Sequence, residues 1–151
     1  MIIAIDGTLA SGKGSSARRI AGWDGLPHMD TGRLYRATGV AAMQAGADFE
    51  DASALAAIAR ALDLNDFEET ELRTAQAGQA ASKVAAVPEV RAALLDLQRA
   101  FANQTGGAVL DGRDIGTVVC PRADVKLWID ASVGARARRR WAEQQAAGGA
   151  R

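Results

Sequence analysis

A glycine-rich loop near the amino terminus constrains the fold of this chain more than any other feature of its sequence. The loop, Gly7–Ser15, matches the pattern G-x-x-x-x-G-K with Gly12 and Lys13 in the last two positions. It follows the apolar run 2–5, which is too short for a helix and is typical of a buried strand. It precedes a helix expected over 15–23. A strand, a loop of this kind and a helix together predict a phosphate-binding unit.

The residue types in the loop suit a phosphate group. Glycines let the backbone curl so that successive N–H groups point at phosphate oxygens. The start of the following helix adds unpaired N–H groups and the positive end of a dipole. Lys13 supplies a charge that can follow a phosphoryl group, and Ser15 or Ser16 can place a hydroxyl on Mg²⁺. The residues expected to hold phosphates are Gly7, Thr8, Leu9, Ala10, Ser11, Gly12, Lys13, Gly14, Ser15 and Ser16. A plain glycine turn between strand and helix is the alternative.

Composition excludes several other classes of protein. The chain has 151 residues, 48% of them hydrophobic, and its 18 Lys and Arg balance 18 Asp and Glu. One domain with a real core is expected, whereas a strongly basic nucleic-acid binder is disfavoured. No run of about 18 apolar residues could cross a membrane, and the start does not resemble a secretory signal. The single cysteine, Cys120, cannot form an internal disulfide. We therefore expect a cytoplasmic monomer that binds neither nucleic acid nor membrane.

Apolar strands alternate with helices along the chain, which predicts an α/β domain with a parallel sheet. Segment 65–73 is acidic and carries no clear pattern. Strands are expected at 2–5, 26–29, 108–110 and 125–129. Helices are expected at 15–23, 30–44, 48–64 and 74–86, and a further helix from Pro88 to about Phe101. A last helix is expected to begin after a cap at Ser132.

Charged residues follow two of these elements. Asp111 ends an apolar strand, where a carboxylate beside a phosphate loop can hold Mg²⁺; a simple turn residue is the alternative. Arg36 and Arg113 are expected to approach the loop beyond the carboxyl ends of the strands, where parallel sheets bind ligands. Because a guanidinium pairs with two phosphate oxygens at once, two arginines there indicate a second phosphate. This pattern favours phosphoryl transfer to a phosphorylated acceptor.

Three parts of the sequence resemble the bacterial cytidylate kinase family: 30–36, 81–85 with 88–91, and 111–119. The run Asp-Gly-Arg-Asp-x-Gly-Thr-Val-Val in the third segment is far more specific than the glycine-rich loop, and the likeness extends over essentially the whole chain. It implies the three-layer P-loop fold of nucleoside monophosphate kinases. The implied domains are a P-loop core, 1–47 with 103–151, and a helical CMP-binding lobe, 48–102.

The resemblance also implies the reaction: transfer of the γ-phosphoryl group of ATP to CMP or dCMP, with Mg²⁺. Asp114 could accept a hydrogen bond from the cytosine amine and Arg91 could donate one to the ring, a pairing that rejects a base with the reverse pattern. The residues implied to be catalytic are Lys13, Arg36, Asp111 and Arg113. Those implied to bind the acceptor are Thr31, Arg36, Ser82, Arg91, Arg113 and Asp114. Arg136 and Arg140 would contact ATP, and Ser15 and Asp111 would hold Mg²⁺.

The chain departs from the family pattern in two places. Segment 63–74 is too short for the family's small β-rich insertion, so this lobe should be mostly helical. The family also continues beyond residue 151 with an arginine-rich lid and a last strand, so strand 125–129 should be unpaired on one side. A lid-less nucleotide-binding fragment with little turnover is therefore the alternative function. A GTPase or regulatory switch ranks last, because the guanine-reading Asn/Thr-Lys-x-Asp motif is absent.

Overall fold

The computed structural model describes residues 1–8, 12–130 and 141–142, and these form two compact units. The first contains residues 1–31 and 98–130 of the described chain, and the second contains 32–97 with 141–142. The division thus falls at 31/32 and 97/98, whereas the family resemblance places the helical lobe at 48–102. In the second unit, Ala37 and Val40 of the helix that begins at Thr31 pack with Leu72 and Ala77.

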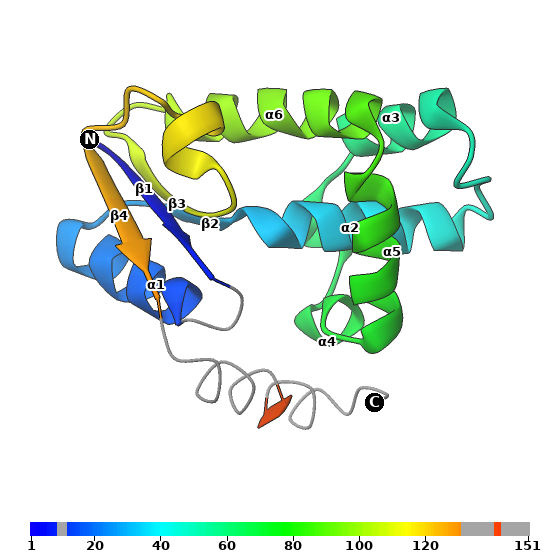
Figure 1. Cartoon of the computed structure of the whole chain (residues 1–151), viewed down its shortest axis with the longest axis horizontal. Coiled ribbons are helices and arrows are strands. Elements are labelled where there is room, and N and C mark those ends of the chain that lie inside the picture. Colours follow the sequence, from blue (N-terminus) through cyan, green and yellow to red (C-terminus); the bar gives the residue numbers. More distant parts are fainter. Residues whose placement is uncertain (9–11, 131–140, 143–151) are drawn as a thin grey trace. The chain divides into compact units, whose positions relative to one another are not determined.

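The first unit is built on a parallel four-stranded sheet. Its strands are β1 (Ile2–Gly7), β2 (His28–Asp30), β3 (Ala108–Gly112) and β4 (Val125–Ile129), in the spatial order β2-β3-β1-β4 (Figure 1). The central strands are the most apolar and the most buried, and every residue of β3 is buried. The expected α/β fold with a parallel sheet is confirmed.

Different elements cover the two faces of this sheet. Helix α1 (Lys13–Asp24) packs Ala17 and Ala21 against Ile3, Ile5 and Val109. Alanine allows the helix to approach the β-branched side chains closely. The other face of β1 contacts a π-helical turn, η2, which spans Ile115–Val119. The sheet is therefore the middle layer of this unit.

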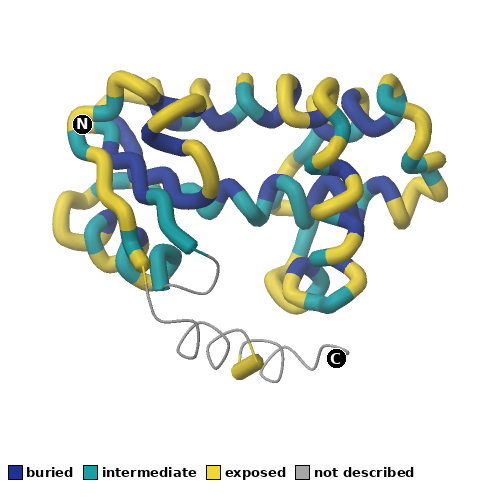
Figure 2. Tube along the Cα trace, in the orientation of Figure 1, coloured by how far each residue is buried: buried dark blue, intermediate teal, exposed yellow. Residues whose placement is uncertain are grey.

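Strand β4 forms one edge of the sheet. In the described residues it pairs only with β1, and its middle residues, Lys126 to Trp128, are exposed (Figure 2). The expectation that this strand has an unpaired side is confirmed for that part of the chain. An exposed strand edge of this kind can pair with another chain.

The second unit is helical. Its elements are α2 (Thr31–Gln44), α3 (Ala52–Arg60), the 3₁₀ turn η1 (Leu64–Asp66), α4 (Glu69–Leu72), α5 (Ala75–Ala85) and α6 (Pro88–Ala102), whose last residues belong to the first unit. Asp51 and Thr74 cap α3 and α5 by accepting hydrogen bonds from backbone N–H groups. Segment 63–74 forms only short helices, as expected for a mostly helical lobe.

Two expectations about local structure need correction, and one lies outside the described residues. Strand β2 begins two residues later than the expected 26–29, because Pro27 has no N–H to donate. The helix expected over 48–64 ends at Arg60. The π-helical turn after Asp114 was not predicted at all. The helix expected after Ser132 lies outside the described residues except for Trp141 and Ala142, which are helical. No helix in the described ranges is long and apolar enough to span a membrane.

Two glycines within helices give opposite predictions for alanine substitution. A Cβ on Gly39 of α2 would lie 2.7 Å from the Cβ of Ala80 on α5, whereas a Cβ on Gly22 of α1 would meet nothing within 4 Å. We expect Gly39→Ala to lower the free energy of unfolding by about 1–3 kcal/mol through overpacking. The matched control, Gly22→Ala, should raise it by about 0.5–1 kcal/mol. Urea unfolding of both variants measures the difference, and equal effects would contradict this packing.

Candidate functional site

The first unit contains a pocket at the carboxyl ends of its strands. Because the strands are parallel, β1, β3 and β4 all end at this edge. The pocket has a volume of about 320 Å³ and is lined by Asp6, Gly7, Thr8, Gly112, Arg113, Asp114 and Trp128. Four of these residues were expected at the site from the sequence: Gly7, Thr8, Arg113 and Asp114. Ligands bind at this edge in open parallel sheets.

The described part of the glycine-rich loop is fixed at both ends. At its start, the hydroxyl of Thr8 donates to an oxygen of Asp130 at 2.8 Å. At its end, Gly12 has φ +94°, a conformation that favours glycine, and α1 begins at Lys13. The Nζ of Lys13 donates to the carbonyl oxygen of Thr8 at 3.3 Å. The ammonium group is therefore held beside the loop. Leu9, Ala10 and Ser11 lie outside the described residues.

The start of α1 can accept an anion. Its first turn contains no acidic residue and its cap, Gly12, provides no side-chain hydrogen bond. The N–H groups of this turn and the positive end of the helix dipole therefore meet no competing negative charge there. Gly14 and Ser16 are half-buried, and the exposed Ser15 has its Oγ 3.4 Å from a guanidinium nitrogen of Arg18.

Asp111 is a buried carboxylate on the same face of the sheet as α1. It is only 3% exposed. It lies two residues after Val109, which packs against that helix, and residues two apart on a strand share a face. The Nε2 of His28, on the neighbouring strand β2, bonds to Oδ2 of Asp111. The hydroxyl of Thr31 donates to the backbone carbonyl of the same residue at 2.8 Å. This hydroxyl, expected to bind the acceptor, has a partner within the protein.

Arg113 and Asp114 follow β3 at the opening of the pocket. Both side chains are exposed, and the described residues offer neither of them a hydrogen bond or ion pair. Asp114 has φ 55°, the left-handed conformation, which aspartate tolerates better than most residues. An exposed guanidinium and an exposed carboxylate on adjacent residues can recognise a ligand that carries both negative charge and hydrogen-bond donors.

The remaining described site residues lie in the helical unit. Arg36 on α2 is half-buried, and Arg91 on α6 donates to the carbonyl oxygen of Ala85 at 2.7 Å. The hydroxyl of Ser82 on α5 donates to the carbonyl oxygen of Gly78 at 3.2 Å. The structure describes these residues within their own unit. Arg136 and Arg140 lie outside the described residues.

Four residues of this region were not predicted as site residues, and one of them is the pocket-lining Gly112. Trp128 and Asp6 line the pocket, and His28 binds Asp111. An acidic residue inside an otherwise apolar strand was a visible signal for Asp6. His28 could not be identified from the sequence, because its partner lies 83 residues away on another strand.

Cys120, the single cysteine, does not line this pocket. Cys120 follows η2 and is 7% exposed. Burial raises the pKa of its thiol, and the positive charge of Arg99 partly opposes that effect. A thiol with a raised pKa is a weak nucleophile at neutral pH.

Comparison with known proteins identifies the family. The family model "Cytidylate kinase" matches residues 3–151. The chain is similar to cytidylate kinase of Methylocella silvestris, at 58% identity over 98% of this chain and 68% of the relative. It is also similar to those of Rhodospirillum rubrum and Rhodopseudomonas palustris, at 57% and 53% identity over 98% of this chain and 71% and 70% of the relatives. With the phosphate loop and the Asp111–Val119 segment in the positions described, the chain belongs to the cytidylate kinase family.

Proposed function

We propose that this chain transfers the γ-phosphoryl group of ATP to CMP or dCMP, giving ADP and CDP or dCDP. Membership of the cytidylate kinase family supports the reaction. The observation that carries the proposal is the pocket in which Arg113 and Asp114 lie with the start of the phosphate loop. The arginine suits the phosphate of an acceptor, and the carboxylate suits the cytosine amine. The helical segment 48–102 would supply the rest of the acceptor lobe, including Ser82 and Arg91.

Positioning and charge neutralisation account for catalysis in this proposal. The phosphate oxygen of CMP is already anionic, so no strong base is required. Lys13 would neutralise charge on the transferred phosphoryl group, and Arg36 and Arg113 would hold the acceptor phosphate in line. Arg136 and Arg140 are proposed to contact ATP. Gly7 to Ser16 would bind its phosphates through backbone N–H groups.

The residues present fit a magnesium ion shared with ATP. The described residues contain no group of three or more His, Cys, Asp or Glu that could hold a metal without help. Mg²⁺ in kinases is held by one or two protein oxygens together with substrate phosphates. Asp111, on the face of the sheet covered by α1, and the Ser15 hydroxyl would supply those oxygens. When bound, Mg²⁺ would neutralise phosphate charge, and His28 would hold one Asp111 oxygen in place.

A panel of acceptors tests the proposed reaction. CMP and dCMP should be phosphorylated at higher kcat/KM than UMP or AMP in a coupled assay that measures ADP. Asp114→Ala should lower kcat/KM for CMP by about 10- to 100-fold, because it removes a charge-assisted hydrogen bond. Asp96→Ala, which removes an exposed carboxylate on α6, is the matched control and should change little. Equal activity on AMP, or CMP kinetics insensitive to Asp114→Ala, would refute the cytosine assignment. ATP and CMP binding without turnover would favour the fragment alternative.

The magnesium assignment has its own test. We expect Mg²⁺ to strengthen ATP binding to the wild-type chain, and Asp111→Asn to reduce that gain by roughly 10-fold or more. Calorimetry with ATP, performed with Mg²⁺ and with EDTA, measures the gain for each chain. Without Mg²⁺ the two chains should bind ATP alike, which controls for damage to the loop. An undiminished gain in Asp111→Asn would exclude Asp111 as a ligand.

A further inference from the structure

Asp6 makes two hydrogen bonds that connect β1 to a segment more than 100 residues away. It is half-buried and lies directly before Gly7, the first residue of the phosphate loop. Its Oδ1 accepts a hydrogen bond from the backbone N–H of Ile115 at 2.8 Å, and its Oδ2 accepts one from that of Gly116 at 2.9 Å. Both oxygens of one carboxylate therefore hold two successive backbone amides.

These two amides belong to the first turn of η2, where N–H groups lack partners within the helix. The residue at the cap position is Asp114, and aspartate there would normally accept such a hydrogen bond with its own side chain. In this structure the Asp114 side chain makes no capping bond. Asp6 on strand β1 caps the turn instead, by accepting hydrogen bonds from its first two N–H groups. The Asp114 carboxylate is therefore left to bind something else.

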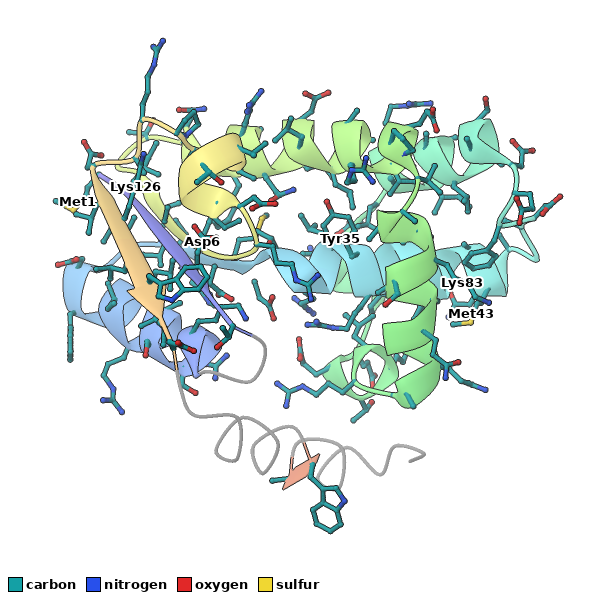
Figure 3. The ribbon with its side chains drawn as sticks, viewed as in Figure 1. Met1, Asp6, Tyr35, Met43, Lys83 and Lys126 are labelled. Atoms are coloured by element: carbon teal, nitrogen blue, oxygen red, sulfur yellow. The ribbon has the colours of Figure 1, made fainter. Side chains whose placement is uncertain are left out.

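The packing around these hydrogen bonds leaves little freedom. A Cβ on Gly116 would lie 3.4 Å from Oδ2 of Asp6 and 3.2 Å from Cδ of Lys126, so glycine permits the close approach. Figure 3 labels Asp6 on β1 and Lys126 on the neighbouring strand β4. At the far end of the turn, the guanidinium of Arg99 donates to the carbonyl oxygens of Val118 and Val119 at 3.0 and 3.2 Å. Side chains from other elements thus hold the turn at both ends.

We propose that Asp6 is the positioning residue for acceptor recognition: by capping η2 it fixes Arg113 and Asp114 in the orientation that distinguishes CMP from UMP. The inference rests on the proposed function. Asp6, Arg113 and Asp114 line the same pocket. Asp6 acts through backbone amides and leaves contact with the base to Asp114. Its two hydrogen bonds therefore connect the end of β1 to the acceptor-binding segment.

Asp6→Asn is the decisive variant. Its amide group can accept only one of the two hydrogen bonds and turns an N–H toward the other donor. We expect the Kd for CMP to rise by about tenfold or more, as for loss of a charge-assisted hydrogen bond. The ratio of the Kd for UMP to that for CMP should fall toward one, while the Kd for ATP changes less than about twofold. Calorimetry with CMP, UMP and ATP gives all three values without requiring turnover.

The chain offers a matched control in Asp124. Its Oδ2 accepts a hydrogen bond from the backbone N–H of Ile2 at 2.7 Å, at the opposite end of β1. Asp124→Asn therefore removes the same kind of contact within the same unit, and should leave the preference for CMP over UMP unchanged. Amide hydrogen exchange supplies a readout that does not depend on ligands: Ile115 and Gly116 should exchange faster in Asp6→Asn and at the wild-type rate in Asp124→Asn.

The outcomes separate this inference from the function on which it rests. If the wild-type chain binds no CMP, the proposed function and this inference both fail. If the wild type prefers CMP and Asp6→Asn retains that preference, this inference alone is refuted. Should Asp6→Asn fail to fold, Asp6→Glu replaces it, because the longer side chain keeps the negative charge but displaces the carboxylate oxygens from the amides of Ile115 and Gly116. A loss of CMP preference in Asp6→Glu supports the inference, and wild-type preference refutes it.

Discussion

Parallel pairing between β1 and β3 is the interaction on which the candidate site depends. In this register Ile5 lies opposite Asp111 and Asp6 lies opposite Gly112. The two strands therefore end at the same level, and the loops that follow them begin side by side. One loop carries the phosphate-binding residues and the other carries Arg113. If the pairing register of β3 with β1 shifted by one residue, the Asp111 side chain would point away from the face covered by α1, because side chains alternate along a strand.

Close approach at the end of β3 makes this arrangement possible. A Cβ on Gly112 would lie 1.9 Å from the Thr31 hydroxyl oxygen, so only glycine fits there. The same hydroxyl binds the backbone of Asp111. Thr31 therefore connects the end of β2 to β3 in this structure. The sequence motifs around Thr31 and Asp111, which look like separate recognition segments, are structurally one contact.

Local patterns predicted most of the fold because each element carries its own signal. The apolar runs in β1 and β3 and the proline that begins α6 could all be identified from neighbouring residues. The π-helical turn after Asp114 could not, because its cap is supplied by Asp6 rather than by a nearby side chain. The same holds for the candidate site. The pocket residues that belong to sequence motifs were predictable, whereas the contact of His28 with Asp111 depends on the pairing of β2 with β3, which no local pattern indicates.

Trp128 makes the pocket accessible to measurement by intrinsic tryptophan fluorescence. Its indole lines the pocket and is 67% exposed, so a nucleotide bound there would change the polarity around the ring and the quenching of its emission. The other two tryptophans, Trp23 and Trp141, are also exposed, at 74% and 58%, but neither lines this pocket. Because Trp128 lies on the exposed edge strand β4 and also lines the pocket, its fluorescence can report acceptor binding in the unlabelled chain.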